Sequence, residues 1–137
     1  MARHVVAPLS EVPPGTRKLV DAGRRPIVVF NVEGRLYAVS NRCPHAGGPL
    51  VAGKLVGLVE ACEPGAYRYS RRNEILKCPW HGWEFDLATG KSRCDPDTVS
   101  VRAYPVDIEP GANVLDGPLA VETFEVAVEN DYIVVTV

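Results

Sequence analysis

Short runs of β-branched and aromatic residues, broken by Gly, Pro, Asn and Asp, extend along most of the chain. This pattern is typical of short strands joined by turns. It predicts strands over residues 26–32, 35–40, 74–78, 83–87, 99–106, 124–128 and 132–137, with turns at 33–34, 88–90 and 129–131. No window of eleven or more residues follows a 3.6-residue hydrophobic period. We therefore expect an all-β fold built from small antiparallel sheets, with one hairpin over 26–40 and another at the end of the chain over 124–137.

Composition adds limits to this picture. The 137 residues, 46% of them hydrophobic and 23% charged, suit one domain with a real core, so we expect a single domain over residues 1–137. The net charge of −2 gives no basic footprint for nucleic acid or for an acidic membrane surface. No apolar run approaches the roughly 18 residues that span a membrane, and residues 1–12 lack the pattern of a secretory signal. The expected location is the cytoplasm.

Candidate chemistry gathers in two turns that each pair a cysteine with a histidine. The first reads Cys43-Pro44-His45 and the second Cys78-Pro79-Trp80-His81, and both are followed by glycine within two residues. The prolines stiffen the turns by fixing φ. The glycines let the backbone approach closely and leave N–H groups free to point at an anion such as a bridging sulfide. Two thiolates and two imidazoles can hold one metal ion or one small cluster.

The same four ligands also occur in mononuclear zinc sites, so zinc is an alternative. Zinc sites usually place cysteine with cysteine and histidine with histidine, whereas each turn here mixes the two. Mixing suits a two-iron cluster in which one iron takes both thiolates and the other both imidazoles. Colour discriminates, because a red-brown protein with two irons and two labile sulfides supports the cluster and a colourless one with a single zinc refutes it.

Two longer segments resemble the Rieske family, whose motif is C-x-H followed by C-x-x-H in two loops. They are Asn41–Leu50 (NRCPHAGGPL) and Cys78–Asp86 (CPWHGWEFD), and the resemblance covers about residues 26–105. It implies one [2Fe–2S] cluster held by two loops at one tip of the fold. By this resemblance one iron is bound by Cys43 and Cys78 and the other by His45 and His81.

The chain departs from the family in the length of two parts. The segment 57–73 between the loops is longer than usual, and the C-terminal part 106–137 is also extended. Long loops in compact domains are often functional. Two interpretations of 57–73 therefore stay open, a solvated surface or a docking surface for a partner, and neither should disturb ligation.

Four positions indicate what kind of Rieske centre this is. High-potential respiratory members resemble this motif but carry a disulfide where Gly48 and Trp80 stand here. They also carry a serine and a tyrosine, whose hydroxyls bond to sulfur, where Trp83 and Phe85 stand. Fewer donors stabilise the reduced cluster less. We expect a low-potential centre of the oxygenase-associated ferredoxin type.

The resemblance then implies an electron-transfer component with no catalytic residue and no small-molecule substrate. It would carry one electron from a reductase to a terminal oxygenase or a similar enzyme. The alternative is a small subunit of a larger redox enzyme, such as a nitrite-reductase-like complex. A self-contained oxygenase needs a second iron site with two histidines and a carboxylate, and no histidine follows His81. We expect Cys62 and Cys94 to be buried free thiols, and His4 to be exposed and without a role.

Overall fold

In the computed structural model the chain forms three small sheets. The structure describes residues 3–44, 47–63, 66–80, 82–93, 95–116, 120–121 and 126–137, and describes only the backbone of 57–63, 66–73, 115–116 and 120–121. The chain divides into two compact units. The first consists of residues 1–40 and 103–137, and the second consists of residues 41–102. Each unit is described by itself.

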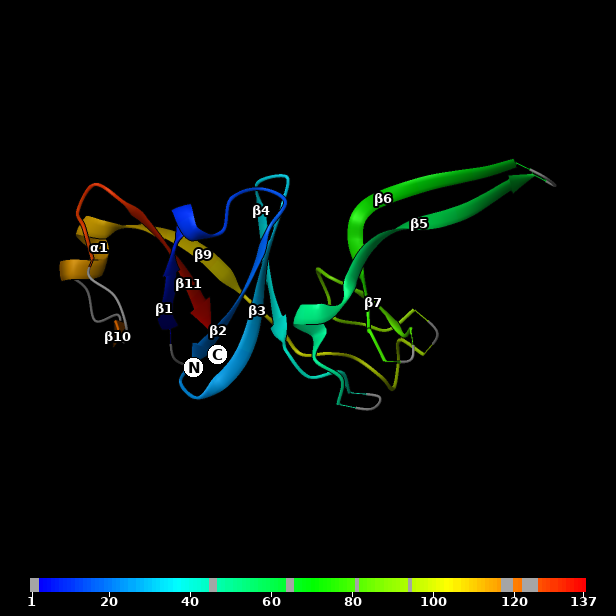
Figure 1. Cartoon of the computed structure of the whole chain (residues 1–137), viewed down its shortest axis with the longest axis horizontal. Helices are drawn as coiled ribbons and strands as arrows, with labels where there is room; N and C mark the ends of the chain where they lie inside the picture. Colours follow the sequence, from blue (N-terminus) through cyan, green and yellow to red (C-terminus); the bar gives the residue numbers. More distant parts are fainter. Residues whose placement is uncertain are drawn as a thin grey trace. The chain divides into compact units, whose positions relative to one another are not determined.

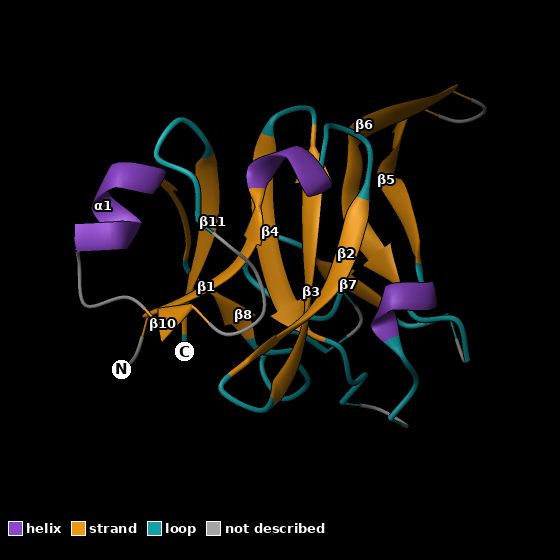
Figure 2. Ribbon diagram, turned by 60° about the vertical axis from the view of Figure 1, so that its left-hand side comes forward, coloured by secondary structure: helices purple, strands orange, loops and turns teal. Residues whose placement is uncertain are grey.

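The first unit contains two four-stranded sheets, shown in Figure 2. One sheet has the order β10-β1-β11-β9, with β1 at Arg3–Pro8, β9 at Val106–Pro110, β10 at Ala120–Val121 and β11 at Asp131–Thr136. The other has the order β2-β3-β4-β8, with β2 at Arg17–Ala22, β3 at Arg25–Val32, β4 at Arg35–Ser40 and β8 at Ala103–Tyr104. A 3₁₀ helix, η1 at Leu9–Glu11, follows β1. Apart from the parallel β1–β10 pair, the pairings in both sheets are antiparallel, which confirms the all-β fold.

The β3–β4 hairpin forms as its sequence predicts. Residues 27–32 are all buried, as befits an apolar strand at the centre of a sheet. Glu33 and Gly34 both have positive φ, 53° and 93°, which is the turn conformation that matches the twist of paired strands. Asn31 is polar and buried, but its amide donates to the carbonyl of Val12 at 2.8 Å and its Oδ1 accepts from the N–H of Gly34 at 2.9 Å. The buried polar side chain of the hairpin therefore has hydrogen-bond partners, and its apolar side chains are packed.

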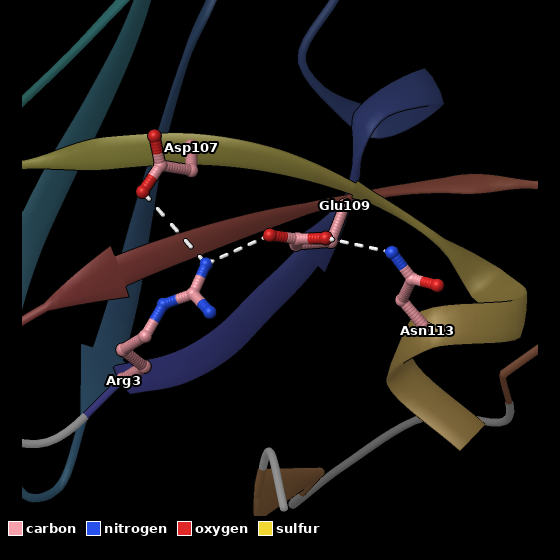
Figure 3. A network of polar contacts seen from close by, with 4 residues as sticks. All are labelled: Arg3, Asp107, Glu109 and Asn113. Atoms are coloured by element: carbon pink, nitrogen blue, oxygen red, sulfur yellow. Dashed lines mark hydrogen bonds and ion pairs between the residues drawn. The ribbon is translucent and has the colours of Figure 1, made fainter. Parts of the chain in front are cut away.

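The α-helix that the described residues contain, α1 at Gly111–Asp116, lies beside the β1–β11–β9 sheet (Figure 2). Val114 of this helix packs with Val5, Tyr132 and Val134 in a small buried cluster. Figure 3 shows a polar network on these elements, in which Arg3 of β1 contacts Glu109 and Asp107 of β9 and Asn113 of α1 also contacts Glu109.

The second unit holds a three-stranded sheet in the order β5-β6-β7. A 3₁₀ helix, η2 at Leu50–Ala52, leads into β5 at Lys54–Glu63, which pairs with β6 at Ala66–Lys77. Together β5 and β6 form a long two-stranded ribbon (Figure 1), whose register shifts between Val56 and Leu58 and again between Ala61 and Glu63. The short strand β7, Glu84–Asp86, pairs with the end of β6 nearest Lys77.

Several expectations about individual segments are wrong. Residues 57–63 and 66–73 belong to the paired strands β5 and β6 rather than to a loop. The predicted strand over 99–106 is limited to β8, and β9 begins only at Val106. Residues 126–128 are not a strand, and the described partners of β11 are β1 and β9. Residues 122–125 lie outside the described residues. The predictions overlooked β1 and α1, whose partners lie far away in the sequence. They also overlooked β2, although it pairs with β3 directly after a two-residue turn.

His4 is also placed differently from the prediction of an exposed, idle side chain. It lies in β1, is only partly exposed, and its Nδ1 atom is buried with no hydrogen-bond partner. A Cβ atom added at Gly23 would lie 3.1 Å from the His4 ring. The ring therefore packs against the backbone of the β2–β3 turn. Among the described residues, no helix combines the length and hydrophobicity that crossing a bilayer requires.

Candidate metal centre

Cys43 and Cys78 begin two turns with the same backbone hydrogen bonds. The N–H of Cys43 donates to the carbonyl of Gly48 at 2.9 Å, and the Cys43 carbonyl accepts from Gly47 at 2.8 Å. In the second turn the N–H of Cys78 donates to the carbonyl of Trp83 at 2.8 Å, and the Cys78 carbonyl accepts from Gly82 at 3.1 Å. Both turns therefore span six residues and present their cysteine in the same way.

A glycine at the fifth position makes each turn possible. Gly47 has a φ of 80° and Gly82 a φ of 72°, in the region that side chains with a Cβ atom rarely adopt. The repeated backbone pattern explains why both turns carry a glycine four residues after the cysteine, although the histidine comes two residues after Cys43 and three after Cys78.

Each turn is fixed to the rest of the second unit. In the first, the carbonyl of Asn41 accepts from Leu50 and its side-chain Oδ1 accepts from Val51, both at 2.8 Å, so the turn is tied to η2. The second turn joins β6 to β7, whose residues Lys77 and Glu84 are directly paired. Rigid elements on both sides hold the two cysteines in place.

Both cysteines are buried and lie outside any disulfide. Cys43 is 1% exposed and Cys78 is 2% exposed. Leu76 and Phe85, near the second turn, are fully buried. Two thiols held in equivalent turns and shielded from water suit metal ligation, since a bound metal deprotonates a coordinating thiol. The residues present therefore fit the thiolate half of a two-iron site.

The first turn passes directly beside the second cysteine. A Cβ atom added at Gly48 would lie 3.1 Å from the Sγ of Cys78 and 3.0 Å from Cγ and Cδ2 of Trp80. Any larger residue at this position would require the Trp80 ring or the Cys78 sulfur to shift by a few tenths of an ångström. Trp80 covers Gly48 while remaining 56% exposed. The structure thus brings both turns together at the level of Cys78.

The aromatic residues after the second turn pack without offering hydroxyl groups. The rings of Trp83 and Phe85 stack with centroids 6.5 Å apart and planes inclined by 25°, and Phe85 is fully buried. Neither side chain offers a hydroxyl donor to a cluster sulfur, so the low-potential centre stays a prediction.

The two predicted histidine ligands, His45 and His81, lie outside the described residues. The structure accordingly places Cys43 and Cys78 of the predicted four. Over the residues that it describes, no three His, Cys, Asp or Glu side chains gather into a set that could hold a metal ion. Cys94 and the side chain of Cys62 also lie outside the described part, so their predicted state as buried thiols stays a prediction.

A hollow beside the second turn was not foreseen from the sequence. It has a volume of about 310 Å³ and is lined by Ala52, Lys54, Lys77, Cys78, Pro79 and Gly82. Lys77 precedes Cys78 and could have been noticed. Its neighbour Lys54 is brought opposite Lys77 only by the register of the β5–β6 ribbon, which the sequence does not reveal.

Comparison with known proteins identifies the family. The model of the Rieske [2Fe-2S] domain matches residues 2–105. The chain belongs to this family. A Rieske domain carries one [2Fe–2S] cluster, so the predicted cofactor is confirmed. The mixed Cys–His turns are thereby explained without zinc.

Proteins similar to this Rieske chain include two that are named as ferredoxins and, in fold, a nitrite reductase small subunit. The 3-phenylpropionate/cinnamic acid dioxygenase ferredoxin subunit of Escherichia coli K12 is 31% identical over 121 residues, covering 88% of this chain and 98% of the relative. The Sphingomonas yanoikuyae B1 ferredoxin is 27% identical, with a TM-score of 0.58 over 78% of this chain and 90% of its own. A chain described as an NADH-dependent nitrite reductase small subunit from Mycobacterium tuberculosis is 20% identical, with a TM-score of 0.62 over 99% and 96%, a likeness of fold alone.

Proposed function

We propose that this Rieske chain is a ferredoxin that carries one electron from a reductase to a terminal oxygenase or a similar redox enzyme. The observation that carries the proposal is the pair of matching turns, each with a buried cysteine and a histidine in its sequence. In this proposal Cys43 and Cys78 bind one iron of the cluster and His45 and His81 bind the other. When bound, the cluster accepts and releases one electron at a time.

The chain's own residues would perform three tasks. The buried cysteines hold the metal away from water, and the turns keep both loops rigid, so that little rearrangement accompanies electron transfer. Trp80 is 56% exposed and, like the sulfur of Cys78, lies against Gly48. Its ring therefore offers a partner protein an aromatic contact close to the cluster loops. No part of this role requires a substrate pocket.

Named relatives support a carrier in an oxygenase system. The Escherichia coli relative is called a dioxygenase ferredoxin subunit, and this chain spans 98% of it. The nitrite reductase subunit resembles this chain in fold alone. A role as a small subunit of a nitrite-reductase-like complex is therefore the weaker alternative, and co-purification of a stable large partner would favour it. A cytoplasmic location is part of the proposal, and cell fractionation tests it.

Ligation can be tested on the anaerobically purified holoprotein. We expect two irons and two labile sulfides per chain. Electron spin echo spectroscopy of the reduced form should show couplings to two imidazole nitrogens. His45→Ala and His81→Ala should each remove one coupling or prevent cluster assembly.

The remaining histidine supplies the control for this experiment. His4→Ala should keep both nitrogen couplings, because His4 packs against the β2–β3 turn of the first unit. A single zinc would contradict the ligand assignment. So would two nitrogen couplings that remain in both the His45→Ala and the His81→Ala variants. Electron transfer is tested separately, by stopped-flow reduction with an NADH-dependent reductase of an oxygenase system.

A further inference from the structure

The hollow beside the Cys78 turn is edged by two lysines that face each other across the ribbon. Lys54 of β5 and Lys77 of β6 are directly paired in the strand register, and both are exposed. Like charges placed directly opposite each other in a sheet are destabilising. The fold therefore maintains a local repulsion at the base of the ribbon, next to a cluster ligand.

Among the residues that the structure describes, no carboxylate forms an ion pair with either lysine. Glu84 is paired with Lys77 in register on the other side, but its Oε2 lies 3.6 Å from Nη1 of Arg93. An unneutralised pair of ammonium groups is favourable only when something else brings negative charge to it.

Gly82 lets Lys77 lie against the second cluster turn. A Cβ atom added at Gly82 would be 3.2 Å from Cε of Lys77. The hollow formed by both lysines also includes Cys78 and Pro79 in its wall. A negative group bound between the lysines would therefore be held beside the turn that carries Cys78.

The formal charge of the chain is also more positive in the unit that contains the two lysines than in the rest of the chain. Residues 41–102 contain nine Lys or Arg and seven Asp or Glu, a formal charge of +2. The rest of the chain contains six and ten, a formal charge of −4. The cluster-bearing unit is thus the positive part of a protein that is negative as a whole.

We propose that Lys54 and Lys77 form a cationic docking site for carboxylates on an acidic surface of the protein that exchanges electrons with this ferredoxin. Docking there neutralises the two lysines and places the partner against the Cys78 turn. Such charges accelerate encounter between proteins and make it sensitive to salt. The inference rests on the proposed carrier function and adds the chemistry of the partner's surface.

The lysine content of the chain allows a direct binding test. The chain has four lysines, Lys18, Lys54, Lys77 and Lys91. Oxidised holoprotein with ¹³C-labelled lysine is titrated with hexacyanochromate(III), a redox-inert paramagnetic trianion that stands in for a cluster of carboxylates. We expect the added broadening of the Lys54 and Lys77 side-chain signals to be at least about three-fold that of Lys18 and Lys91, and to disappear at high salt. Equal broadening of all four signals, or stronger broadening of Lys18 or Lys91, overturns the proposal.

A kinetic test uses two oxidants of opposite charge on the dithionite-reduced holoprotein. Ferricyanide is a trianion, and cobalt tris(phenanthroline) is a trication. In the Lys54→Gln/Lys77→Gln double variant at low ionic strength, we expect the rate with ferricyanide to fall about five-fold and the rate with the cobalt complex to rise. Lys91→Gln is the matched control, because Lys91 is an exposed lysine of the same unit that does not line the hollow.

These experiments separate failure of the docking site from failure of the carrier function. If the rates of the double variant match those of the wild type with both oxidants, the docking site is refuted while the electron carrier stands. If the holoprotein holds no reducible [2Fe–2S] cluster, the carrier function itself fails. The visible spectrum of each variant shows that its cluster is intact before its rates are compared.

Discussion

Gly48 is the residue on which the approach of the two cluster turns most directly depends. A methyl group at this position would lie 3.0 Å from the Trp80 ring and 3.1 Å from the Cys78 sulfur. Contacts this short force neighbouring atoms to move, and the sulfur of a cysteine that binds iron, as we propose for Cys78, has little freedom to do so. Gly48→Ala should therefore lower the iron content of the purified protein and alter its visible and EPR spectra.

Two further variants show whether crowding is the cause. Gly15→Ala adds a methyl group at another turn glycine, with a φ of 87° and no atom within 4 Å of the new Cβ. It should leave the cluster spectra unchanged. Adding Trp80→Ala to the Gly48→Ala chain removes the ring contacts and should restore part of the iron content. Spectra of Gly48→Ala identical to the wild type would mean that the turns have room to separate.

Glu109 gives the first unit a contribution to stability that depends on pH. Hydrogen bonds from Arg3, at 2.9 Å, and from Asn113, at 3.2 Å, hold the pKa of the Glu109 carboxyl below its ordinary value (Figure 3). The contribution is fully present above the ordinary glutamate pKa of about 4.3 and is lost as the pH falls through the lowered value. Glu109→Gln should therefore lower Tm at pH 7 and have less effect at pH 3.

Thermal unfolding followed by circular dichroism measures this difference. Because the network is solvent-exposed, the change at pH 7 should be small. Glu33→Gln, at the exposed β3–β4 turn, is the control and should give no such pH-dependent difference. An equal loss of Tm from Glu109→Gln at both pH values would show that the carboxylate charge is not responsible.

The candidate ligands could be predicted at the residue scale because their signal is local. Cysteine, proline, histidine and glycine stand within a few positions of one another in each turn, and the structure gives both turns the same hydrogen bonds. The basic hollow could not be predicted, because Lys54 meets Lys77 only through the register of two strands. The charges of Lys54 and Lys77 alone gave no reason to expect two residues so far apart in the sequence to be neighbours.

At the scale of elements, the start of α1 is fixed by the glycine at which it begins. The N–H of Gly111 donates to the carbonyl of Asn130 at 2.7 Å, and an added Cβ would lie 1.9 Å from the carbonyl oxygen of Ala127. The helix cannot keep this position with any side chain there. Gly111→Ala should lower the free energy of unfolding by about 2 kcal/mol or more.

Urea denaturation measures this loss, and Gly15→Ala is again the comparison. That variant carries the cost of a positive φ without a clash, so it should lose less than Gly111→Ala. The cluster spectrum of the folded Gly111 variant should match the wild type, because the cluster turns belong to residues 41–102. Equal losses in the two variants would show that the chain relaxes around the new Cβ atom and that the contact with Ala127 does not set the cost.

The β5–β6 ribbon is an element that can be shortened without touching the cluster turns. Its base is held by the pairs from Lys54 with Lys77 to Val56 with Ile75, and Glu74 also accepts a hydrogen bond from Leu87 at 2.9 Å. Replacing residues 57–73 with Gly-Asn-Gly keeps these contacts. The shortened chain should retain its iron content and EPR spectrum. Loss of the cluster would show that the ribbon supports ligation.

Closeness in sequence made the β3–β4 hairpin predictable, but β2, which pairs with β3 across a two-residue turn, was still overlooked. The β3–β4 hairpin has apolar strands and a two-residue turn, and the structure reproduces it. The C-terminal segment was misread for the opposite reason. Residues Tyr132–Val135 are buried between β1 and β9, partners more than twenty residues away, whereas the sequence favoured the adjacent segment 124–128. Antiparallel pairing between distant strands leaves no local trace.

At the scale of the whole molecule, the two units differ in how they are stabilised. The first unit has a large aliphatic cluster that includes Val12, Ile27, Val29 and Ile133. In the second unit, the buried residues at the two turns include Cys43 and Cys78, the proposed ligands. A site that is absent from the unfolded chain couples metal binding to folding. The second unit should therefore depend on the cluster more strongly than the first.

Hydrogen exchange before and after removal of iron tests this dependence. In the apoprotein the amides of Cys43, Gly47, Cys78 and Gly82, which bond within the turns, should lose most of their protection. Amides in β3 and β11 should keep theirs. Uniform loss of protection throughout the chain would mean that the two units unfold together.

The contact between residues 48 and 80 also has an evolutionary meaning. A Cβ atom at 48 would lie 3.0 Å from Cγ of Trp80, and disulfides join Cβ atoms about 3.5–4.5 Å apart. The backbone thus already holds these two positions at bridging distance. Glycine and tryptophan codons can each become cysteine codons by a single nucleotide change. The disulfide of the high-potential members is therefore within reach without rebuilding either loop, whereas their hydroxyl donors require separate changes at Trp83 and Phe85.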